Sequence, residues 1–339
     1  MRIIAVVKKN YDFIELEAML DKHKPNQLRL FVYTEKNNIK LHNYAKNVLR
    51  SLSLKFKNRS INIEEKYLYI DKIKNGRDIY NIILPFIEGD CIVALPLGNG
   101  RYFVDSVKYF NRNPNVTCYH LSDGILDFIP RHKYYFIKNK LSIINLLKSL
   151  LSYFKLINNR SEFSFSIFSN YSAFSKNTTK IKPNSNYSKQ AREMIDDVMP
   201  LVSKAKNGIL LIPTNTISKE MLMLNFNLQG LTERIIISSK TGEVVLNNKE
   251  YWSGIPISAE ELLQTGYISQ IYAGPSTAAF YAKELNSDAS VTILSSYVEK
   301  KYIGLREHNW LKKQSINYGI KYVYLRNKQM FEDSNRSVT

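Results

Sequence analysis

The chain has 339 residues, of which 44% are hydrophobic, so it is long enough for two folded domains of roughly 150 residues each. Its 48 lysines and arginines outnumber its 30 aspartates and glutamates and give a net charge of +18, which favours an anionic partner: a nucleotide-linked substrate, a nucleic acid or an anionic membrane surface. The sequence contains no zinc-finger spacing and no ribonucleoprotein aromatic motif, so composition and motifs exclude these compact nucleic-acid modules.

The first apolar run, residues 3–7, is too short for a signal peptide or a membrane span, so we expect it to be a buried strand of a cytoplasmic protein. Cys91 and Cys118 both fall in apolar, strand-like surroundings. Neither has a neighbour at metal-ligand or redox spacing. We therefore expect two buried, reduced thiols in a reducing compartment, and neither a metal nor another cofactor.

The first half alternates strand-like and helix-like segments, which is typical of a parallel sheet with crossover helices. Strands are predicted at residues 3–7, 28–33, 66–70, 91–95 and 115–120, and helices at residues 13–22, 44–52, 77–86 and 102–110. An apolar helix edged with lysine is predicted at residues 141–156. Its apolar face is expected in the core, and adsorption to an anionic membrane is the alternative.

Two loops at the ends of neighbouring predicted strands contain residue types that binding sites use. Gly98 and Asn99 follow the strand at 91–95, and Asp123 and Gly124 follow the strand at 115–120. The carboxyl ends of parallel strands meet at one edge of a sheet, where ligands bind in open α/β folds. A carboxylate at Asp123 could take a proton from a substrate hydroxyl, although Asp-Gly is also a common turn dipeptide.

The second half repeats the alternation after a stretch rich in Asn, Ser and Lys. Strands are predicted at residues 208–212, 234–237, 268–273 and 291–294, and helices at residues 191–199, 220–228, 260–263 and 278–285. The expected organisation is a first α/β domain over 1–157, a connector over 158–190, a second α/β domain over 191–299 and a basic, aromatic segment over 300–339. That last segment is expected to touch a membrane or to pack back on the first domain.

The stretch Gly274-Pro275-Ser276-Thr277 separates a predicted strand from a predicted helix. Gly274 permits a sharp exit from the strand, and Ser276 and Thr277 can cap the helix that follows. The free N–H groups of a helix start, together with two hydroxyls, suit a phosphate-sized anion, and an ordinary helix cap is the alternative interpretation. Thr214 and Asn215, which follow the strand at 208–212, are also expected to lie at the site.

Ser122-Asp123-Gly124 and Ser276-Thr277, in this order, resemble two motifs of the bacterial sialyltransferases of GT-B architecture, which build lipooligosaccharide, O-antigen and capsule. The resemblance implies two Rossmann-like domains facing across a cleft. It also implies an inverting, metal-independent transfer of sialic acid from CMP-sialic acid to a galactose-type hydroxyl of a bacterial surface glycan. Asp123 would be the general base, and Ser276 and Thr277 would bind the donor. The enzyme would be peripheral on the inner face of the membrane.

The third motif of this family, a His-Pro pair that contacts the donor phosphate, does not occur, since none of the five histidines is followed by proline. After the strand at 234–237, where that motif would fall, stand Ser238, Ser239 and Lys240. Two hydroxyls and an ammonium could stabilise a leaving phosphate. The departure leaves two alternatives: a divergent branch with a different phosphate contact, or a protein outside the family.

Two other functions fit the same sequence. One is a GT-B glycosyltransferase that uses another CMP-nonulosonic acid or a nucleotide diphosphate sugar. The other is a non-catalytic protein that binds nucleic acid or a membrane surface through its net charge of +18. Because the lysines and arginines are spread along the chain, we expect no nucleic-acid partner. The resemblance implies CMP-sialic acid as the donor and a glycan or glycolipid as the acceptor.

Overall fold

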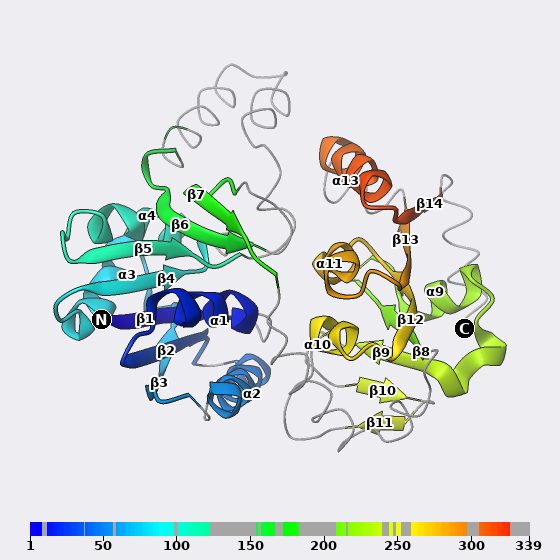
Figure 1. The fold of residues 1–339 in the computed structure, drawn as a ribbon, viewed down its shortest axis with the longest axis horizontal. Helices are drawn as coiled ribbons and strands as arrows, with labels where there is room; N and C mark the ends of the chain where they lie inside the picture. Colours follow the sequence, from blue (N-terminus) through cyan, green and yellow to red (C-terminus); the bar gives the residue numbers. More distant parts are fainter. Residues whose placement is uncertain are drawn as a thin grey trace. The chain divides into compact units, whose positions relative to one another are not determined.

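The computed structural model describes residues 1–8, 12–36, 38–56, 59–97, 101–122, 154, 157–166, 172–182, 208–214, 216–238, 244–246, 249–251, 259–296 and 305–325. The chain divides into two compact units, Met1–Ile181 and Lys182–Thr339. Each unit contains a sheet with helices against it (Figure 1). The two units are described one after the other.

The sheet of the first unit has seven strands in the order β3-β2-β1-β4-β5-β6-β7, and every neighbouring pair is parallel. The strands are β1 (Arg2–Val7), β2 (Gln27–Thr34), β3 (Asn62–Tyr69), β4 (Cys91–Leu95), β5 (Val116–His120), β6 (Ser161–Ser166) and β7 (Ser175–Lys180). All five residues of β4 are buried. A parallel strand covered on both faces needs such a continuous apolar run.

Helices cover both faces of this sheet. They are α1 (Asp12–His23), α2 (Ile39–Phe56), α3 (Gly76–Ile83) and α4 (Arg101–Phe110). The apolar side chains of α3 and α4 join one core cluster with Ile4, Val6 and Val93 from the sheet. On the opposite face, where Figure 1 shows α1 in front of β1, the rings of Phe13 and Phe56 stack at 4.9 Å and join α1 to α2. The expected α/β fold with a parallel sheet is confirmed in this unit.

Strands β6 and β7 fall inside the predicted connector, residues 158–190, and so differ from that expectation. β7 lies at the edge of the sheet, and most of its residues are exposed or half-buried, so its polar sequence suits its position. Toward β6 it presents Ser175 and Thr178, whose hydroxyls lie 2.7 Å and 2.9 Å from the Ser164 hydroxyl. Hydrogen-bonded hydroxyls take the place of apolar contacts between these two strands. The segment is therefore rich in polar residues, and for that reason its composition predicted a loop.

The sheet of the second unit has the order β11-β10-β9-β8-β12-β13-β14. Its strands are β8 (Gly208–Ile212), β9 (Ile235–Ser238), β10 (Val244–Leu246), β11 (Lys249–Tyr251), β12 (Ile268–Ala273), β13 (Ser290–Ser296) and β14 (Lys321–Leu325). Five adjacent strands, β9, β8, β12, β13 and β14, are parallel, which again confirms the expected α/β fold. β10 and β11 add an antiparallel extension beyond β9 that was not predicted.

The helices of the second unit are α9 (Lys219–Asn225), α10 (Ala259–Gln264), α11 (Thr277–Leu285) and α13 (Leu305–Asn317). Met221 and Leu222 of α9 pack in one cluster with Ile209 and Leu211 of β8. α10 and α11 pack against each other, and α11 packs against β12 and β13.

The predicted C-terminal segment, residues 300–339, contributes a helix and a strand to the second unit. β14 pairs in parallel with β13, with Thr292 opposite Lys321, and α13 packs against β14. Residues 305–325 thus complete the second sheet. Residues 326–339, like the helices predicted at 141–156 and 191–199, lie largely or wholly outside the described residues.

Candidate active site

Each sheet contains a switch point, which is a pair of neighbouring strands from which the chain continues toward opposite edges of the sheet. In the first sheet the strands are β1 and β4, and in the second they are β8 and β12. At such a switch point the loops that leave the carboxyl ends of the two strands diverge and open a crevice, where open α/β folds bind ligands. Most of the predicted site residues follow strands at or beside these two positions.

In the first unit, the described chain stops just before the predicted residues. Asp123 and Gly124 directly follow Ser122, and Gly98 and Asn99 directly follow Leu97, but all four lie outside the described residues. The residues that precede them are described. The bonds of Ser122 and Leu97 fix where the chain leaves β5 and β4.

Ser122 is held by a carboxylate from α1. Its backbone N–H donates to Oε2 of Glu15 at 2.9 Å, although the two residues are 107 positions apart in the sequence. Glu15 is 4% exposed and Ser122 is 3% exposed, so this bond is buried. Glu15 thus fixes the backbone one residue before Asp123.

His120, the last residue of β5, joins the same loop to the one after β4. Its Nδ1 lies 3.3 Å from the backbone N–H of Leu97 and 3.3 Å from the carbonyl of Leu95. The backbone N–H of Leu121 also donates to the Leu95 carbonyl, at 2.9 Å. His120 is 1% exposed and its ring contacts Phe174. This buried ring links two loops, which suits a structural histidine.

The first turn of α1 places a second carboxylate at the end of β1. Asp12 is 3% exposed, and its Oδ2 accepts a hydrogen bond from the Lys8 N–H at 2.8 Å. The sequence analysis predicted only a helix at residues 13–22 and missed both Asp12 and Glu15. The sequence contained a signal for them. An Asp followed three positions later by a Glu is a known signature of a helix N-terminus, and here it comes just after a buried strand.

In the second unit, the structure brings Thr214 and Gly274 together at the switch point. Gly274 follows β12 and its N–H donates to the carbonyl of Ile212, the last residue of β8, at 3.0 Å. A Cβ atom added to Gly274 would lie 2.5 Å from Oγ1 of Thr214, which shows how closely the two loops pass. Only glycine allows this approach without displacing Thr214.

Thr214 itself is fixed within its own loop. Its Oγ1 accepts a hydrogen bond from the Ile217 N–H at 3.2 Å, and its own N–H donates to the Ile217 carbonyl at 2.9 Å. The hydroxyl of Thr216 lies 3.3 Å from the same Oγ1. The half-buried Thr214 hydroxyl is therefore held beside Gly274, at the carboxyl end of β8, with the Thr216 hydroxyl next to it.

Ser276 and Thr277 lie at the start of α11, as predicted. Ser276 is the N-cap, and its Oγ accepts a hydrogen bond from the Ala279 N–H at 3.2 Å. An N-cap satisfies one of the N–H groups at a helix start, and the hydroxyl keeps its own O–H donor. Both residues are half-buried. The arrangement can stabilise a negative charge, because the helix dipole and the N–H groups act in the same sense.

Ser238 is the last residue of β9, next to β8, and is 8% exposed. It stands at the same carboxyl edge as Thr214 and Gly274. Asn215, Ser239 and Lys240 lie outside the described residues. Of the predicted donor-binding residues of this unit, Thr214, Ser238, Gly274, Ser276 and Thr277 are described, and all five are found at strand ends or at the helix start on one edge of the sheet.

The two thiols are buried and unpaired with each other, as predicted. Cys91 and Cys118 are 2% and 1% exposed. Burial raises the pKa of the Cys91 thiol to about 11 and that of the Cys118 thiol to about 12. Among the residues that the structure describes, no group of three His, Cys, Asp or Glu side chains could hold a metal ion. Within the same ranges no helix combines the length and the apolar character needed to cross a membrane.

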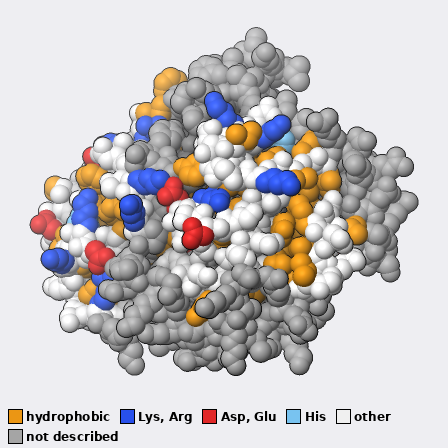
Figure 2. Space-filling view, turned by 45° about the vertical axis from the view of Figure 1, so that its right-hand side comes forward, with side chains coloured by type: hydrophobic (Ala, Val, Ile, Leu, Met, Phe, Trp, Pro, Cys, Tyr) orange, Lys and Arg blue, Asp and Glu red, His pale blue; other side chains and the backbone are white. Residues whose placement is uncertain are grey.

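On the face drawn in Figure 2, the described lysine and arginine side chains are scattered among uncharged ones. The sequence matches no protein-family model and no curated protein. The resemblance to bacterial sialyltransferases therefore stays a prediction that rests on the short motifs and their positions in the fold.

Proposed function

We propose that the chain is an inverting, metal-independent glycosyltransferase of GT-B architecture that transfers sialic acid from CMP-sialic acid to a galactose-type hydroxyl of a bacterial surface glycan. The observation that carries the proposal is the meeting of Thr214, Gly274 and the α11 start at the switch point of the second sheet. Four predicted residues from two separate loops, Thr214 from one and Gly274, Ser276 and Thr277 from the other, lie there, at the edge where α/β sheets bind nucleotides.

The second unit would bind the CMP part of the donor. A nucleoside monophosphate has a single phosphate, and the O–H and N–H groups at Ser276 and Thr277 suit one anion of that size. Ser238, at the end of β9, with Ser239 and Lys240 after it, would supply the contact that a His-Pro pair makes elsewhere in the family. The net charge of +18 favours the approach of an anionic donor.

The first unit would supply the base. In the proposed reaction, the acceptor hydroxyl gives its proton to the Asp123 carboxylate while its oxygen forms a bond to the anomeric carbon of sialic acid. The bond from that carbon to the CMP phosphate oxygen breaks, and the electron pair leaves with CMP. Attack opposite the leaving group inverts the anomeric configuration. The developing charge on the phosphate is stabilised by fixed dipoles, so the step needs no metal.

Donor binding tests the nucleotide specificity. Calorimetric titration should show CMP binding more tightly than UDP or GDP, and CMP binding should weaken in Ser276→Ala. Tighter binding of UDP or GDP would favour a nucleotide diphosphate sugar as donor. Absence of nucleotide binding, together with steeply salt-dependent binding of oligonucleotides, would favour the non-catalytic alternative.

Transfer from CMP-sialic acid tests the base. Asp123→Asn should lose transfer to a galactose-terminated acceptor and should keep the wild-type affinity for CMP, because the side chain is proposed to act on the acceptor proton alone. An undiminished rate in Asp123→Asn would refute the assignment of the base.

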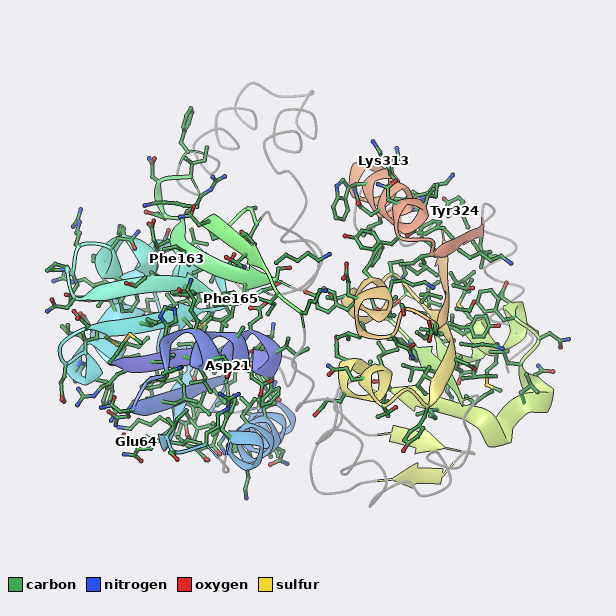
Figure 3. The ribbon with its side chains drawn as sticks, viewed as in Figure 1. Asp21, Glu64, Phe163, Phe165, Lys313 and Tyr324 are labelled. Atoms are coloured by element: carbon green, nitrogen blue, oxygen red, sulfur yellow. The ribbon has the colours of Figure 1, made fainter. Side chains whose placement is uncertain are left out.

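Helix α13 supports the part of the proposal that concerns a membrane. Lys312 and Lys313 are exposed on it, and Ile316 is 65% exposed. Figure 3 labels Lys313 on this helix and Tyr324 on the neighbouring strand β14. Basic and apolar side chains exposed on one helix favour adsorption to an anionic bilayer. An enzyme with a lipid-linked acceptor would gain from such contact.

Vesicle sedimentation tests this contact. The double variant Lys312→Glu/Lys313→Glu should lose binding to vesicles of phosphatidylglycerol and phosphatidylcholine. The control Lys108→Glu/Lys219→Glu changes the net charge equally at exposed lysines of α4 and α9 and should bind as the wild type does. Equal loss in both variants would show that only the net charge matters.

A further inference from the structure

We propose that Ser295 is a further donor-binding residue, whose buried hydroxyl binds the phosphate of CMP together with the start of α11. The inference rests on the proposed function, because it concerns the same nucleotide site. Ser295 belongs to β13 and lies one position beyond the strand predicted at residues 291–294, and the sequence analysis missed it. It would add a third strand to a site that is otherwise built from the loops after β8 and β12.

The hydroxyl of Ser295 is buried without a hydrogen-bond partner. Ser295 is 0% exposed, and no residue in the part of the chain that the structure describes forms a hydrogen bond with its Oγ. Buried hydroxyls are nearly always hydrogen-bonded, because an unsatisfied one destabilises the fold. A hydroxyl that the folded chain leaves unsatisfied therefore indicates a partner from outside the chain, which is either a ligand or an ordered water.

Strand pairing places Ser295 beside the loop that carries Gly274. Ala273, the last residue of β12, lies opposite Ile293 of β13. Ser295 is two positions further along β13, and a strand advances about 3.3 Å per residue, so Ser295 lies beyond the end of β12, at the level of this loop. On its other side it lies opposite Tyr324 of β14, which Figure 3 labels. Ser295 is thus at the edge of the sheet where the donor is proposed to bind.

The side chain of Ser295 faces α11. Side chains alternate along a strand, so Ser295 and its neighbour Leu294 lie on opposite faces of the sheet. Leu294 packs in the cluster that includes Met221 of α9. α11 packs against β12 and β13, and Figure 1 shows it on the side of this sheet away from α9. Because α11 begins at the edge where Ser295 lies, the hydroxyl faces the first turn of this helix, whose N-cap is Ser276.

A hydroxyl beneath the start of a helix suits a phosphate. α11 has nine residues, and the N–H groups and the dipole at its start favour an anion. The Ser295 hydroxyl can donate a hydrogen bond to the same anion. A hydrogen bond to a charged group is stronger than one between neutral groups. The phosphate would therefore satisfy the hydroxyl that the chain leaves without a partner.

Binding requires a small shift, because Ser295 has no exposed surface. The first turn of α11 carries the small side chains of Ala278 and Ala279, and a serine hydroxyl turns about a single bond. Hydrogen bonds of a site often form fully only when the ligand is present. A hydroxyl that gains its partner only on binding makes the free protein less stable than it could be, which is a common cost of functional residues.

The experiment compares Ser295→Ala with the matched control Ser315→Ala. Ser315 is also a serine of the second unit with 0% exposure, but its Oγ donates to the Leu311 carbonyl of α13 at 2.8 Å. Each variant loses one buried hydroxyl, which in Ser315 has a partner in the chain and in Ser295 has none among the described residues. The urea midpoint is measured without ligand, and the affinities for CMP and for inorganic phosphate are measured by calorimetry.

Ser295→Ala should raise the urea midpoint of the free protein, because it removes an unsatisfied buried hydroxyl. It should weaken the binding of CMP and of inorganic phosphate by about 3- to 10-fold, which is the effect of one lost hydrogen bond. Ser315→Ala should bind both ligands as the wild type does. A gain in stability together with a loss in affinity distinguishes a binding residue from a structural one.

Three results would overturn the inference. Wild-type affinity for CMP in Ser295→Ala would show that the hydroxyl does not meet the nucleotide. A lowered urea midpoint in this variant would show that the hydroxyl has a structural partner such as an ordered water. Weaker CMP binding with unchanged phosphate binding, or an equal loss of affinity in Ser315→Ala, would remove the assignment to the phosphate.

The two probes separate this inference from the proposed function. If the wild type binds CMP and Ser295→Ala binds it equally well, the inference fails and the proposed donor site stands. If the wild type binds inorganic phosphate and no CMP, the proposed function fails, and the phosphate affinities of the two variants still decide the role of Ser295. Binding of neither ligand by the wild type would overturn both.

Discussion

Substitution of Gly274 by alanine tests the geometry of the second switch point. The new Cβ would lie 2.5 Å from Oγ1, 2.6 Å from Cγ2 and 3.0 Å from Cβ of Thr214. Atoms in ordinary contact are about 3.5–4.0 Å apart, so the overlap with the first two atoms is about 1 Å. The φ angle of Gly274 lies outside the left-handed region, so the expected cost comes from the overlap alone.

The magnitude follows from what Thr214 must give up. Moving its side chain strains the packing of the two loops, at about 1–3 kcal/mol. It also breaks the 3.2 Å hydrogen bond from the Ile217 N–H, which contributes about 0.5–1.5 kcal/mol. We therefore expect Gly274→Ala to lower the free energy of unfolding of the second unit by about 1.5–4.5 kcal/mol and to weaken CMP binding.

Urea denaturation followed by circular dichroism measures this loss, and a double-mutant cycle assigns it. Thr214→Ala removes two of the three overlapping atoms, so adding Gly274→Ala to it should cost less than half as much as in the wild type. Gly230→Ala is the control, because its Cβ would meet nothing within 4 Å. Two results would refute the close approach of the two loops. One is that the free-energy changes of Gly274→Ala and Thr214→Ala are strictly additive, and the other is that Gly274→Ala lowers the free energy of unfolding by less than about 0.5 kcal/mol.

Three further predictions concern the first unit. Gly76→Ala should destabilise this unit by about 1–3 kcal/mol or more, because its Cβ would lie 2.4 Å from backbone atoms of α4, which cannot rotate away; an unchanged urea midpoint would contradict this. Burial, and to a smaller extent the neighbouring Lys22, lowers the pKa of His23 below 6.5. The unfolded chain therefore binds the proton more readily than the folded protein, and the free energy of unfolding falls as the pH is lowered through 6.5. His23→Gln should reduce this slope, measured as urea midpoints between about pH 5 and 7.5, and an identical slope would contradict it. Cys91 and Cys118, with pKa values raised to about 11 and about 12, should react with a disulfide reagent at pH 8 only after unfolding, and fast reaction of either thiol in the native protein would contradict their burial.

The central strands could be predicted from the sequence because β4 and β8 are continuous apolar runs and β12 is bounded by apolar residues. The predicted ranges 91–95, 208–212 and 268–273 coincide with β4, β8 and β12. A parallel strand that is covered on both faces must be a continuous apolar run, and that pattern is readable without an alignment. The N-cap at Ser276 was readable for a similar reason, since its signal is local.

The edge strand β7 and the pairing at Glu15 could not be predicted in the same way. β7 is polar because it lies at the edge, so composition indicated a loop. The partner of Glu15 is 107 positions away, and its identity depends on the order of the strands, which local patterns do not reveal. Thr214 and Gly274 were each predicted from their own loops, but the contact between them follows only from the adjacency of β8 and β12.

The central position of β1 has a consequence for how the first sheet forms during synthesis. β1 is synthesised before both of its neighbours in the sheet, β2 and β4, and β4 ends only at Leu95. Five of its six residues are buried in the finished sheet. Until β4 has been made, one edge of this apolar strand has no partner, and such edges promote aggregation. A nascent chain that ends between residues 34 and 91 contains β1 and β2 without β4, so one edge of β1 is unpaired in it.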